Sequence, residues 1–161
     1  MDKIEGKFKD LPLRTGVGII LLNKENKVFV AKRIDNPKNF WQMPQGGVDA
    51  GEDYLTAAYR ELEEETSIKD VKLIQELEGS TTYILPKHLL GMIWKGKYKG
   101  QKQKWFLMRH VNNDQEINIK TKNPEFLDWK WIELDQITDL VVDFKLNVYK
   151  ELKEKVKKII N

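Results

Sequence analysis

The sequence predicts an α+β fold in which a mixed β-sheet lies between helices, as an α/β/α sandwich. Strand-like segments occur on both sides of a central helix, and a second amphipathic helix closes the chain. No repeat, low-complexity tract or Pro/Gly/Ser-rich linker divides the sequence. Its 161 residues, 40% of them hydrophobic and 33% charged, can bury one sizeable core, so we expect a single domain over 1–161.

A β-hairpin is predicted near the start of the chain. Residues 16–22 (GVGIILL) form a short apolar run of the kind found in buried strands, and a polar turn, 23–26 (NKEN), follows. Residues 27–33 (KVFVAKR) then have the pattern of a second strand. Because the turn is short, we expect the two strands to pair with each other.

A loop and a helix come next. Residues 37–47 are loop-like, with Trp41 and Met43 as the expected packing residues. From about residue 53 to residue 66, apolar residues recur at helical spacing. The side chains expected on the buried face of this helix are Leu55, Ala58, Leu62 and, as a further candidate, Tyr59.

The second half of the chain predicts two strands and the closing helix. Residues 105–111 are strand-like, and in 127–131 (LDWKW) apolar residues alternate with polar ones, as in a half-buried strand. Asp143 is a candidate N-cap for the last helix. The apolar face of that helix, opposite many lysines, is expected to contain Phe144, Val148, Leu152, Val156 and Ile159.

Composition excludes several kinds of site. The chain has no cysteine, which excludes disulfides, zinc–thiolate sites and a cysteine nucleophile. Residues 1–10 (MDKIEGKFKD) are rich in charge and lack the apolar core of a secretory signal. No apolar run approaches the roughly 20 residues that a membrane helix needs. We therefore expect a cytoplasmic protein that does not contact a membrane.

The most informative chemical feature is a cluster of carboxylates in 61–65 (ELEEE). Glu61, Glu64 and Glu65 stand at i, i+3 and i+4, so on a helix their side chains share one patch. Like charges at these spacings destabilise a helix by about 0.2–0.5 kcal/mol per pair, so we expect a cation to neutralise them. Carboxylate oxygens suit Mg²⁺ or Mn²⁺, and Mg²⁺ commonly binds carboxylates together with substrate phosphates. The pattern therefore predicts metal-assisted attack on a phosphate.

A second feature is the segment 79–113, which contains no acidic residue but holds six lysines, Arg109 and several aromatic residues. Such a surface attracts polyanions, and its aromatic rings could stack on bases. The alternative is a solvated lysine-rich surface whose aromatic residues belong to the core. We expect the core for Trp105 and Phe106, while both interpretations stay open for the lysines.

Residues 46–68 (GGVDAGEDYLTAAYRELEEETSI) resemble the Nudix box, the sequence signature of the Nudix family. The first glycine, Glu52 after five residues and 60–65 (RELEEE) after seven more stand at the spacing of that signature. Ser67 departs from it, because the family usually has glycine there. That glycine ends the helix in a conformation that glycine adopts cheaply, so the serine is expected to cost some stability without removing a metal ligand.

The likeness extends from about residue 11 to residue 150. It covers RTGVG, WQMPQGG, YILP, GQKQKWF, PEF and VDFK. These motifs resemble the Nudix branch that contains the RNA pyrophosphohydrolases and the dinucleoside polyphosphate hydrolases, some of them described as invasion-associated. The resemblance implies a Nudix fold and hydrolysis of a nucleotide-linked polyphosphate.

The resemblance also implies roles for the acidic residues. Glu61, Glu64 and Glu65 would bind the metal together with the backbone carbonyl of Gly46. One of the three glutamates would be the general base for the attacking water, and we favour Glu65. Glu125 would supply a further ligand or assist the base, the alternative being a surface glutamate.

Other residues would hold the substrate or brace the site. Arg14 and Arg33 match positions that contact the phosphates and the base, and a guanidinium suits both because it grips phosphate bidentately and stacks on rings. Phe144 is either a base-stacking platform or part of the core. Glu52 and Arg60 are expected to pair and brace the loop against the helix. Further substrate-binding candidates are Tyr83, Lys102, Lys104 and Lys145, whereas His88 and His110 are isolated in the sequence.

The predicted activity is metal-dependent conversion of 5′-triphosphorylated RNA to the 5′ monophosphate, which would promote mRNA decay. The alternative is hydrolysis of diadenosine polyphosphates of the Ap4A or Ap5A type by the same machinery. A distant alternative, a Nudix module that binds nucleotide or RNA without cleaving it, conflicts with the intact box glutamates. The basic segment 79–113 favours RNA, because a longer polyanion gains more from extra lysines. We expect a monomer that uses Mg²⁺, with Mn²⁺ or another divalent cation as the alternative.

Overall fold

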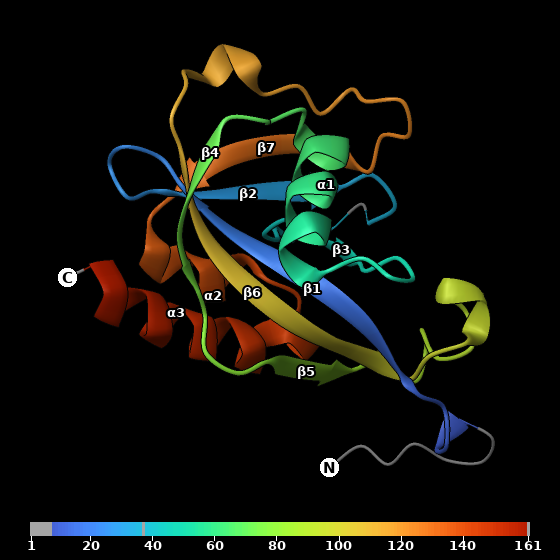
Figure 1. Ribbon diagram of the computed structural model, residues 1–161. Helices are drawn as coiled ribbons and strands as arrows, with labels where there is room; N and C mark the ends of the chain where they lie inside the picture. Colours follow the sequence, from blue (N-terminus) through green and yellow to red (C-terminus); the bar gives the residue numbers. More distant parts are fainter. Residues whose placement is uncertain (1–7, 37, 161) are drawn as a thin grey trace.

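A seven-stranded mixed sheet forms the centre of the computed structural model, which describes residues 8–36 and 38–160 (Figure 1). The strand order is β4-β6-β1-β2-β7, with β3 beside β1 and β5 beside β6. The strands are β1 (Leu13–Leu22), β2 (Val28–Arg33), β3 (Gln45–Gly47), β4 (Val71–Glu76), β5 (Thr81–Ile84), β6 (Gly100–His110) and β7 (Phe126–Ile132). β1 and β6 run parallel and the other named pairs are antiparallel, so the predicted mixed sheet is confirmed.

Helices cover both faces of this sheet. Helix α1 (Tyr54–Thr66) lies on one face, and α2 (Ile137–Leu140) and α3 (Leu146–Ile160) lie on the other (Figure 1). Two separate clusters of buried side chains follow from this arrangement, one beneath α1 and one beneath α3. Short 3₁₀ turns complete the fold: η2 (Trp94–Gly96), η3 (Asp114–Glu116), η4 (Leu134–Gln136) and η5 (Asp143–Lys145). The predicted α/β/α sandwich is therefore confirmed.

The apolar run in β1 is buried on both faces of the sheet. Ile19 faces the cluster beneath α1, whereas Ile20 faces the cluster beneath α3, and both are fully buried. A central strand covered on both sides needs a continuous apolar run, which is the pattern seen in the sequence. β1 and β2 pair antiparallel across the predicted turn, with Leu22 opposite Val28, so the predicted hairpin is confirmed.

Helix α1 has a defined cap at each end. The Asp53 carboxylate accepts a hydrogen bond from the backbone N–H of Thr56 at 2.7 Å. Ser67 ends the helix in the left-handed region, with φ of 67°, where glycine is the usual residue. Leu55 lies partly buried, and the buried side chains are Ala57, Ala58, Leu62, Glu65 and Thr66. Tyr59 is 36% exposed, so the expectation that it is buried is wrong, because the packed stripe runs through the alanines instead.

The alternation predicted for β7 holds only in part. Trp129 and Trp131 pack against the cluster beneath α1, but Leu127 is 61% exposed. The cause is an irregularity in the pairing with β2, where Arg33 lies opposite Phe126 and the next residue back, Lys32, lies opposite Asp128. One extra residue on β7 shifts the alternation, so Phe126 is buried in place of Leu127.

The closing helix is amphipathic as predicted, with Val148, Leu152 and Val156 buried. It begins at Leu146, after the 3₁₀ turn η5. Asp143 is the first residue of that turn and makes no capping hydrogen bond, so its predicted N-cap role is wrong. The helix continues directly from η5, so its first residue stands three positions after Asp143.

The loop before β3 is tied to α3. Trp41 and Met43 are buried, as predicted. The backbone N–H of Met43 donates to the hydroxyl of Tyr149 at 2.9 Å, and both groups are buried. Burying this hydroxyl with a partner avoids an unsatisfied polar group and sets the position of β3.

The expectation that residues 37–47 form only a loop is wrong at its end, because Gln45–Gly47 pair with β1 as β3. Two further strands, β4 and β5, were not predicted, and both are held by β6. β4 has a mixed burial pattern without clear alternation, so its residues carry little strand signal. No helix in the described part of the chain is long and apolar enough to cross a bilayer. Residues 1–7, which form most of the charged start discussed above, lie outside the described residues, as do Pro37 and Asn161.

Candidate active site

A cleft of about 1140 Å³ opens where the ends of β1, β2 and β3 meet α1 on one side and η5 on the other. Nine of the residues proposed from the sequence line it: Arg14, Arg33, Gly46, Glu61, Glu64, Tyr83, Glu125, Phe144 and Lys145. Among these nine, the acidic side chains come from α1 and from the segment before β7, whereas the basic ones come from β1, β2 and η5. The cleft therefore brings together groups suited to binding a metal ion and a phosphate chain.

Arg60 braces the acidic wall of this cleft. Its Nε and Nη2 atoms donate to the two carboxylate oxygens of Glu52 at 2.8 and 2.9 Å. Nη2 also donates to the backbone carbonyl of Gly47 at 2.9 Å. The hydrogen bonds from Arg60 and from the backbone of Asp49 lower the pKa of Glu52 to about 2. The pair joins β3 and the following turn to α1.

The same guanidinium holds two of the box carboxylates. Nη1 of Arg60 donates to Glu61 Oε1 at 2.8 Å and to Glu64 Oε2 at 3.2 Å. Burial raises the pKa of Glu61, and the hydrogen bond from Arg60 opposes that shift. Glu64 is more open, with 58% of its side chain exposed. The two carboxylates therefore lie at the cleft wall in quite different surroundings.

Glu65 is the most unusual of the three glutamates, because it is only 3% exposed. Its Oε1 atom is buried and has no hydrogen-bond partner among the described residues. Burial, the negative charges of Glu125 and Glu61 and a hydrogen bond with Glu125 raise its pKa well above the ordinary value. Glu125 is exposed and lines the cleft. It comes from a distant part of the chain, and its carboxylate interacts with that of Glu65.

These donors fit a hard divalent cation by their chemistry. A Cβ atom on Gly46 would lie 2.0 Å from the Glu61 carboxylate, so only glycine lets the backbone approach this closely. The unpartnered oxygen of buried Glu65, whose pKa is raised well above the ordinary value, marks a carboxylate that lacks a counter-ion. Within the described residues, no three acidic or histidine side chains already converge on one point, since Arg60 draws Glu61 and Glu64 towards itself.

The basic wall is built around a buried lysine. Lys145 is 6% exposed, and its Nζ atom lies 3.4 Å from the side-chain oxygens of both Gln42 and Gln45. Burial, together with the positive charge of Arg33, lowers the pKa of Lys145 to about 7. Arg33 is held by a bidentate pair with Asp35, with both bonds at 2.8 Å.

Two aromatic side chains lie beside Lys145. The rings of Tyr83 and Phe144 are 5.6 Å apart, and Nζ of Lys145 lies 5.4 Å from the Tyr83 ring. Tyr83 is buried, and its hydroxyl donates to Gln101 Oε1 at 2.8 Å. Burial raises the pKa of Tyr83 to about 12, so its hydroxyl remains protonated. Phe144 packs against the cluster beneath α3 and also lines the cleft, so both alternatives raised for it hold in part.

Comparison with known proteins agrees with this geometry. The family model described as NUDIX domain matches residues 12–152. The chain belongs to the Nudix family. It is 75% identical over 152 residues to the RNA pyrophosphohydrolase of Pelagibacter ubique (94% of this chain, 96% of that protein). It is 49% identical over 142 residues to the RNA pyrophosphohydrolase of Rhodospirillum rubrum (88% of this chain, 86% of that protein).

Solved structures agree on the Nudix fold. The E. coli dihydroneopterin triphosphate pyrophosphohydrolase superposes with a TM-score of 0.68 at 21% identity, covering 89% of this chain and 98% of that one. A C. elegans Ap4A hydrolase complex gives 0.62 at 19% identity, with the same coverage. At these identities the likeness shows the fold alone.

Two lysines proposed from the sequence do not line this Nudix cleft. Lys104 donates to the backbone carbonyl of Gly79 at 2.9 Å and lies 3.6 Å from Glu76. Lys102 is exposed on β6, two residues before Lys104. Both point to the face of the sheet that carries α1, because side chains alternate along β6, and it is Gln101 and Gln103 that are buried. Trp105 and Phe106 are buried in the core, as expected.

Several site residues were not assigned from the sequence. Gln42, Gln45, Gln101 and Gln103 appear there only as letters in the motifs WQMPQGG and GQKQKWF. In the structure they partner Lys145 and Tyr83 and each other, with Gln103 Nε2 donating to Gln45 Oε1 at 3.1 Å. His88 lines the cleft, whereas His110 is buried away from it and pairs with Glu116 at 3.1 Å. Motif membership was the one available signal for the glutamines.

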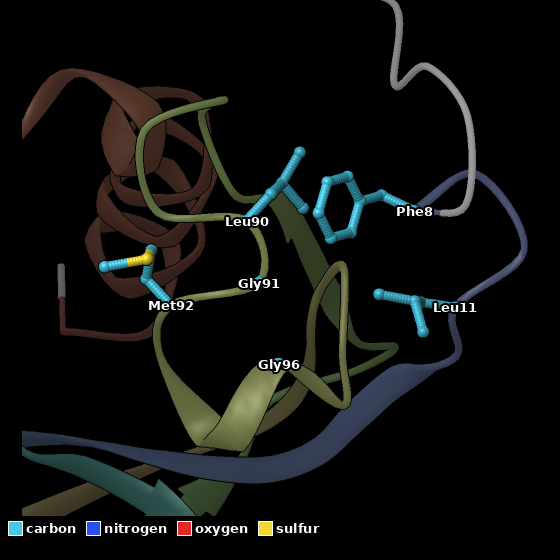
Figure 2. Close-up of a pocket in the computed structure, with 6 residues that line it drawn as sticks. All are labelled: Phe8, Leu11, Leu90, Gly91, Met92 and Gly96. Carbon is cyan, nitrogen blue, oxygen red and sulfur yellow. The ribbon is translucent and has the colours of Figure 1, made fainter.

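A second hollow, of about 510 Å³, lies beside the loop before β6. Figure 2 shows Phe8, Leu11 and Leu90 facing this space, whose remaining lining is Gly91, Met92 and Gly96. None of these side chains carries a charge or a polar group suited to phosphate. The polar cleft is therefore the site that fits Nudix chemistry.

Proposed function

We propose that this chain is an RNA 5′-pyrophosphohydrolase that converts 5′-triphosphorylated RNA to the 5′ monophosphate and so promotes mRNA decay. As a Nudix hydrolase it acts on phosphoanhydride bonds. The observation that carries the proposal is the cleft in which the acidic wall of α1 faces the cations Arg14, Arg33 and Lys145. Relatives named RNA pyrophosphohydrolase, at 75% and 49% identity, support RNA as the substrate.

Glu61, Glu64, Glu65 and the carbonyl of Gly46 would hold the divalent cation that Nudix hydrolases use, for which we propose Mg²⁺, or alternatively Mn²⁺. When bound, such a cation polarises the phosphate, lowers the pKa of an attacking water and neutralises developing charge. Arg60 keeps Glu61 and Glu64 at the cleft wall through its hydrogen bonds to both.

The general base is proposed to be Glu65, with Glu125 assisting it. Its carboxylate is buried and its pKa is raised, and a base works best when its pKa is near the working pH. Glu125 raises this pKa through its charge and shares a hydrogen bond with Glu65. Removal of Glu125 would therefore lower the pKa of Glu65 and make it a weaker base.

The RNA end would be held by the opposite wall. Arg14 and Lys145 offer N–H donors to the phosphates, and Tyr83 lines the same wall. The face of Phe144 could take a stacked base. Arg33 lines the same cleft, and its guanidinium could contact the phosphates or the base. Lys102 and Lys104 lie outside the cleft, so we assign them at most an interaction with RNA beyond the reacting end.

The alternative substrate, a diadenosine polyphosphate, would use the same machinery. No feature of the described cleft favours a second adenosine over an RNA chain, and the fold likeness to an Ap4A hydrolase carries no substrate information. The single domain over 1–161, the monomeric state and the cytoplasmic location remain predictions from the sequence.

The test is hydrolysis by the purified protein with Mg²⁺, comparing 5′-triphosphorylated RNA with diadenosine tetraphosphate. We expect a higher kcat/KM for the RNA, and a kcat lowered about 100-fold or more by Glu64→Gln or Glu65→Gln. Glu63→Gln is the matched control, because Glu63 is exposed on the same helix and lies outside the proposed ligand set. If wild type cleaves neither substrate faster than the two variants do, the enzymatic proposal fails, and if it cleaves the dinucleotide alone, the RNA proposal fails.

A further inference from the structure

The guanidinium of Arg14 lies against the ring of Trp94. Arg14 Cζ is 5.2 Å from the centre of that ring, and both residues line the cleft. Arg33 and Arg60 differ, because each is paired with carboxylates. Among the ion pairs of the described residues, none involves Arg14. Its charge is therefore held near an aromatic face without being neutralised by an acid.

Trp94 is held in this position by an unusual backbone. Trp94, Lys95 and Gly96 have φ angles of 51°, 57° and 70°, so three successive residues lie in the left-handed region. This region disfavours residues other than glycine, and such strain persists only where surrounding contacts maintain it. The turn is closed by hydrogen bonds from Gly96 N to Ile93 O at 2.9 Å and from Lys97 N to Trp94 O at 3.2 Å.

Neighbouring residues keep this turn in place. The Trp94 ring meets the ring of Tyr98 edge-on, with centres 6.1 Å apart. A Cβ atom on Gly96 would lie 3.0 Å from the carbonyl oxygen of Gly91, so the loop closes tightly on itself, and both glycines are labelled in Figure 2. The loop thus presents one face of the indole to the cleft at a defined place.

Arg14 also lies close against Gly47. A Cβ atom on Gly47 would lie 2.4 Å from Arg14 Nη2, so the guanidinium fits only because this residue is glycine. Gly47 also accepts the hydrogen bond from Arg60 that braces the acidic wall. Arg14 therefore lies close both to the Trp94 ring and to the backbone that Arg60 ties to the acidic wall.

We propose that Trp94 is a positioning residue, whose indole face holds the Arg14 guanidinium beside Gly47 in the orientation that receives a substrate phosphate. A guanidinium stacked on a ring uses its face, so its in-plane N–H donors stay available for the phosphate oxygens. A carboxylate partner would occupy those donors. The inference rests on the proposed function for the identity of the phosphate, but the placement of Arg14 by Trp94 does not depend on it.

The first test is a double-mutant cycle on hydrolysis of 5′-triphosphorylated RNA. Trp94→Leu removes the aromatic face, and we expect KM to rise about three- to tenfold while kcat changes less than about twofold. Trp94→Phe keeps an aromatic face and should stay within about twofold of wild type. In an Arg14→Gln background, Trp94→Leu should add less than about twofold.

The cycle has a clear opposing outcome. If Trp94→Leu multiplies KM as much in the Arg14→Gln background as in wild type, Trp94 does not act through Arg14. If Trp94→Phe is as impaired as Trp94→Leu, the role is one of bulk rather than of an aromatic face. Tyr59→Leu, which removes an exposed aromatic residue on α1, is the matched control and should leave KM unchanged.

The second test does not use a substrate. The Nε–H proton of Arg14 should resonate upfield of its ordinary position in the NMR spectrum of wild type, because the indole ring current shields it. The shift should disappear in Trp94→Leu and persist in Tyr59→Leu. An unshifted Arg14 signal in wild type overturns the inference. If wild type fails to cleave the RNA but shows the shift, the proposed function fails while the placement of Arg14 by Trp94 stands.

Discussion

Glu52 and Arg60 form a two-point ion pair, with Arg60 Nε 2.8 Å from one carboxylate oxygen and Nη2 2.9 Å from the other. The same guanidinium donates to the carbonyl of Gly47 and to the carboxylate of Glu61. One arginine therefore links the turn before α1, the end of β3 and the acidic wall. Because neither Glu52 nor Arg60 lines the cleft, the pair acts on the chemistry by positioning other residues.

The first prediction concerns Glu52→Gln, which keeps the shape of the side chain but removes its charge. We expect a lower Tm and a lower kcat, because Arg60 would hold the β3 turn less firmly. The pKa of Glu52 is about 2 against an ordinary 4.5, so its stabilisation is present above pH 4.5 and is lost as the pH falls through about 2. Thermal unfolding across this range should show a smaller acid-dependent loss in the variant. Glu25→Gln, in an exposed turn, is the control. The prediction is contradicted if Glu52→Gln loses as much Tm as wild type when the pH falls from 4.5 to about 2.

The second prediction is that Glu65→Gln abolishes activity but raises the stability of the metal-free protein near neutral pH. Burial and the neighbouring carboxylates raise the pKa of Glu65, so the folded state binds this proton more tightly than the unfolded state does. Stability therefore falls as the pH rises above the ordinary value of 4.5, and glutamine avoids that loss. Thermal unfolding in EDTA at pH 8 measures it.

Added Mg²⁺ or Mn²⁺ completes this experiment. A ligand that binds only the folded state raises Tm, so wild type should gain more than Glu65→Gln does. Glu63→Gln should behave as wild type in EDTA and in metal. Equal metal-induced shifts in wild type and in Glu65→Gln would show that Glu65 is not a ligand.

The third prediction concerns Lys145, whose pKa is lowered to about 7 by burial and by Arg33. For wild type, kcat/KM on the RNA should fall as the pH rises above about 7, because the ammonium that receives the phosphate loses its charge. Lys145→Arg should move this fall to higher pH. Lys145→Met should lower kcat/KM by about tenfold or more, and its kcat/KM should not decrease further as the pH rises above about 7.

Lys145 should make the stability of the folded protein rise with pH, whereas it makes kcat/KM fall. The unfolded chain binds this proton up to the ordinary pKa of 10.5, whereas the folded chain releases it near 7. The unfolded state therefore binds more protons between these values, so the stability of wild type rises with pH across that window. Denaturant unfolding of Lys145→Met should lack this rise, and the same rise in both proteins would refute the assignment.

The fourth prediction concerns Ser67 at the end of α1. Its φ of 67° costs a residue other than glycine about 1–2 kcal/mol, whereas its hydroxyl donates to Asn118 O at 2.8 Å, which contributes about 0.5–1.5 kcal/mol. Ser67→Gly relieves the strain and loses the bond, so we expect a net change between about 0.5 kcal/mol of lost stability and about 1.5 kcal/mol of added stability. Ser67→Ala keeps the strain and loses the bond, so it should be destabilised by about 1 kcal/mol. Chemical denaturation gives the order, and an alanine variant as stable as the glycine variant would contradict it.

Much of the fold could be predicted because its signals are local. The hairpin of β1 and β2 and the helix α1 follow from apolar periodicity and from a short polar turn. Leu127 shows the limit of such patterns, because an irregular pairing with β2 shifts the alternation of β7 and turns this side chain outward. β4 was missed for a related reason, since its residues become a strand by pairing with β6.

The sequence by itself determined the family and the carboxylates proposed to bind the metal, because the spacing of Glu61, Glu64 and Glu65 along one helix is a local property. Tertiary structure alone decided that Glu65 is buried beside Glu125 and that Lys145 is buried between two glutamines. It also decided that Arg14 lies on the ring of Trp94. Burial, pKa and contacts between distant segments depend on which surfaces pack together, and no spacing along the chain specifies that.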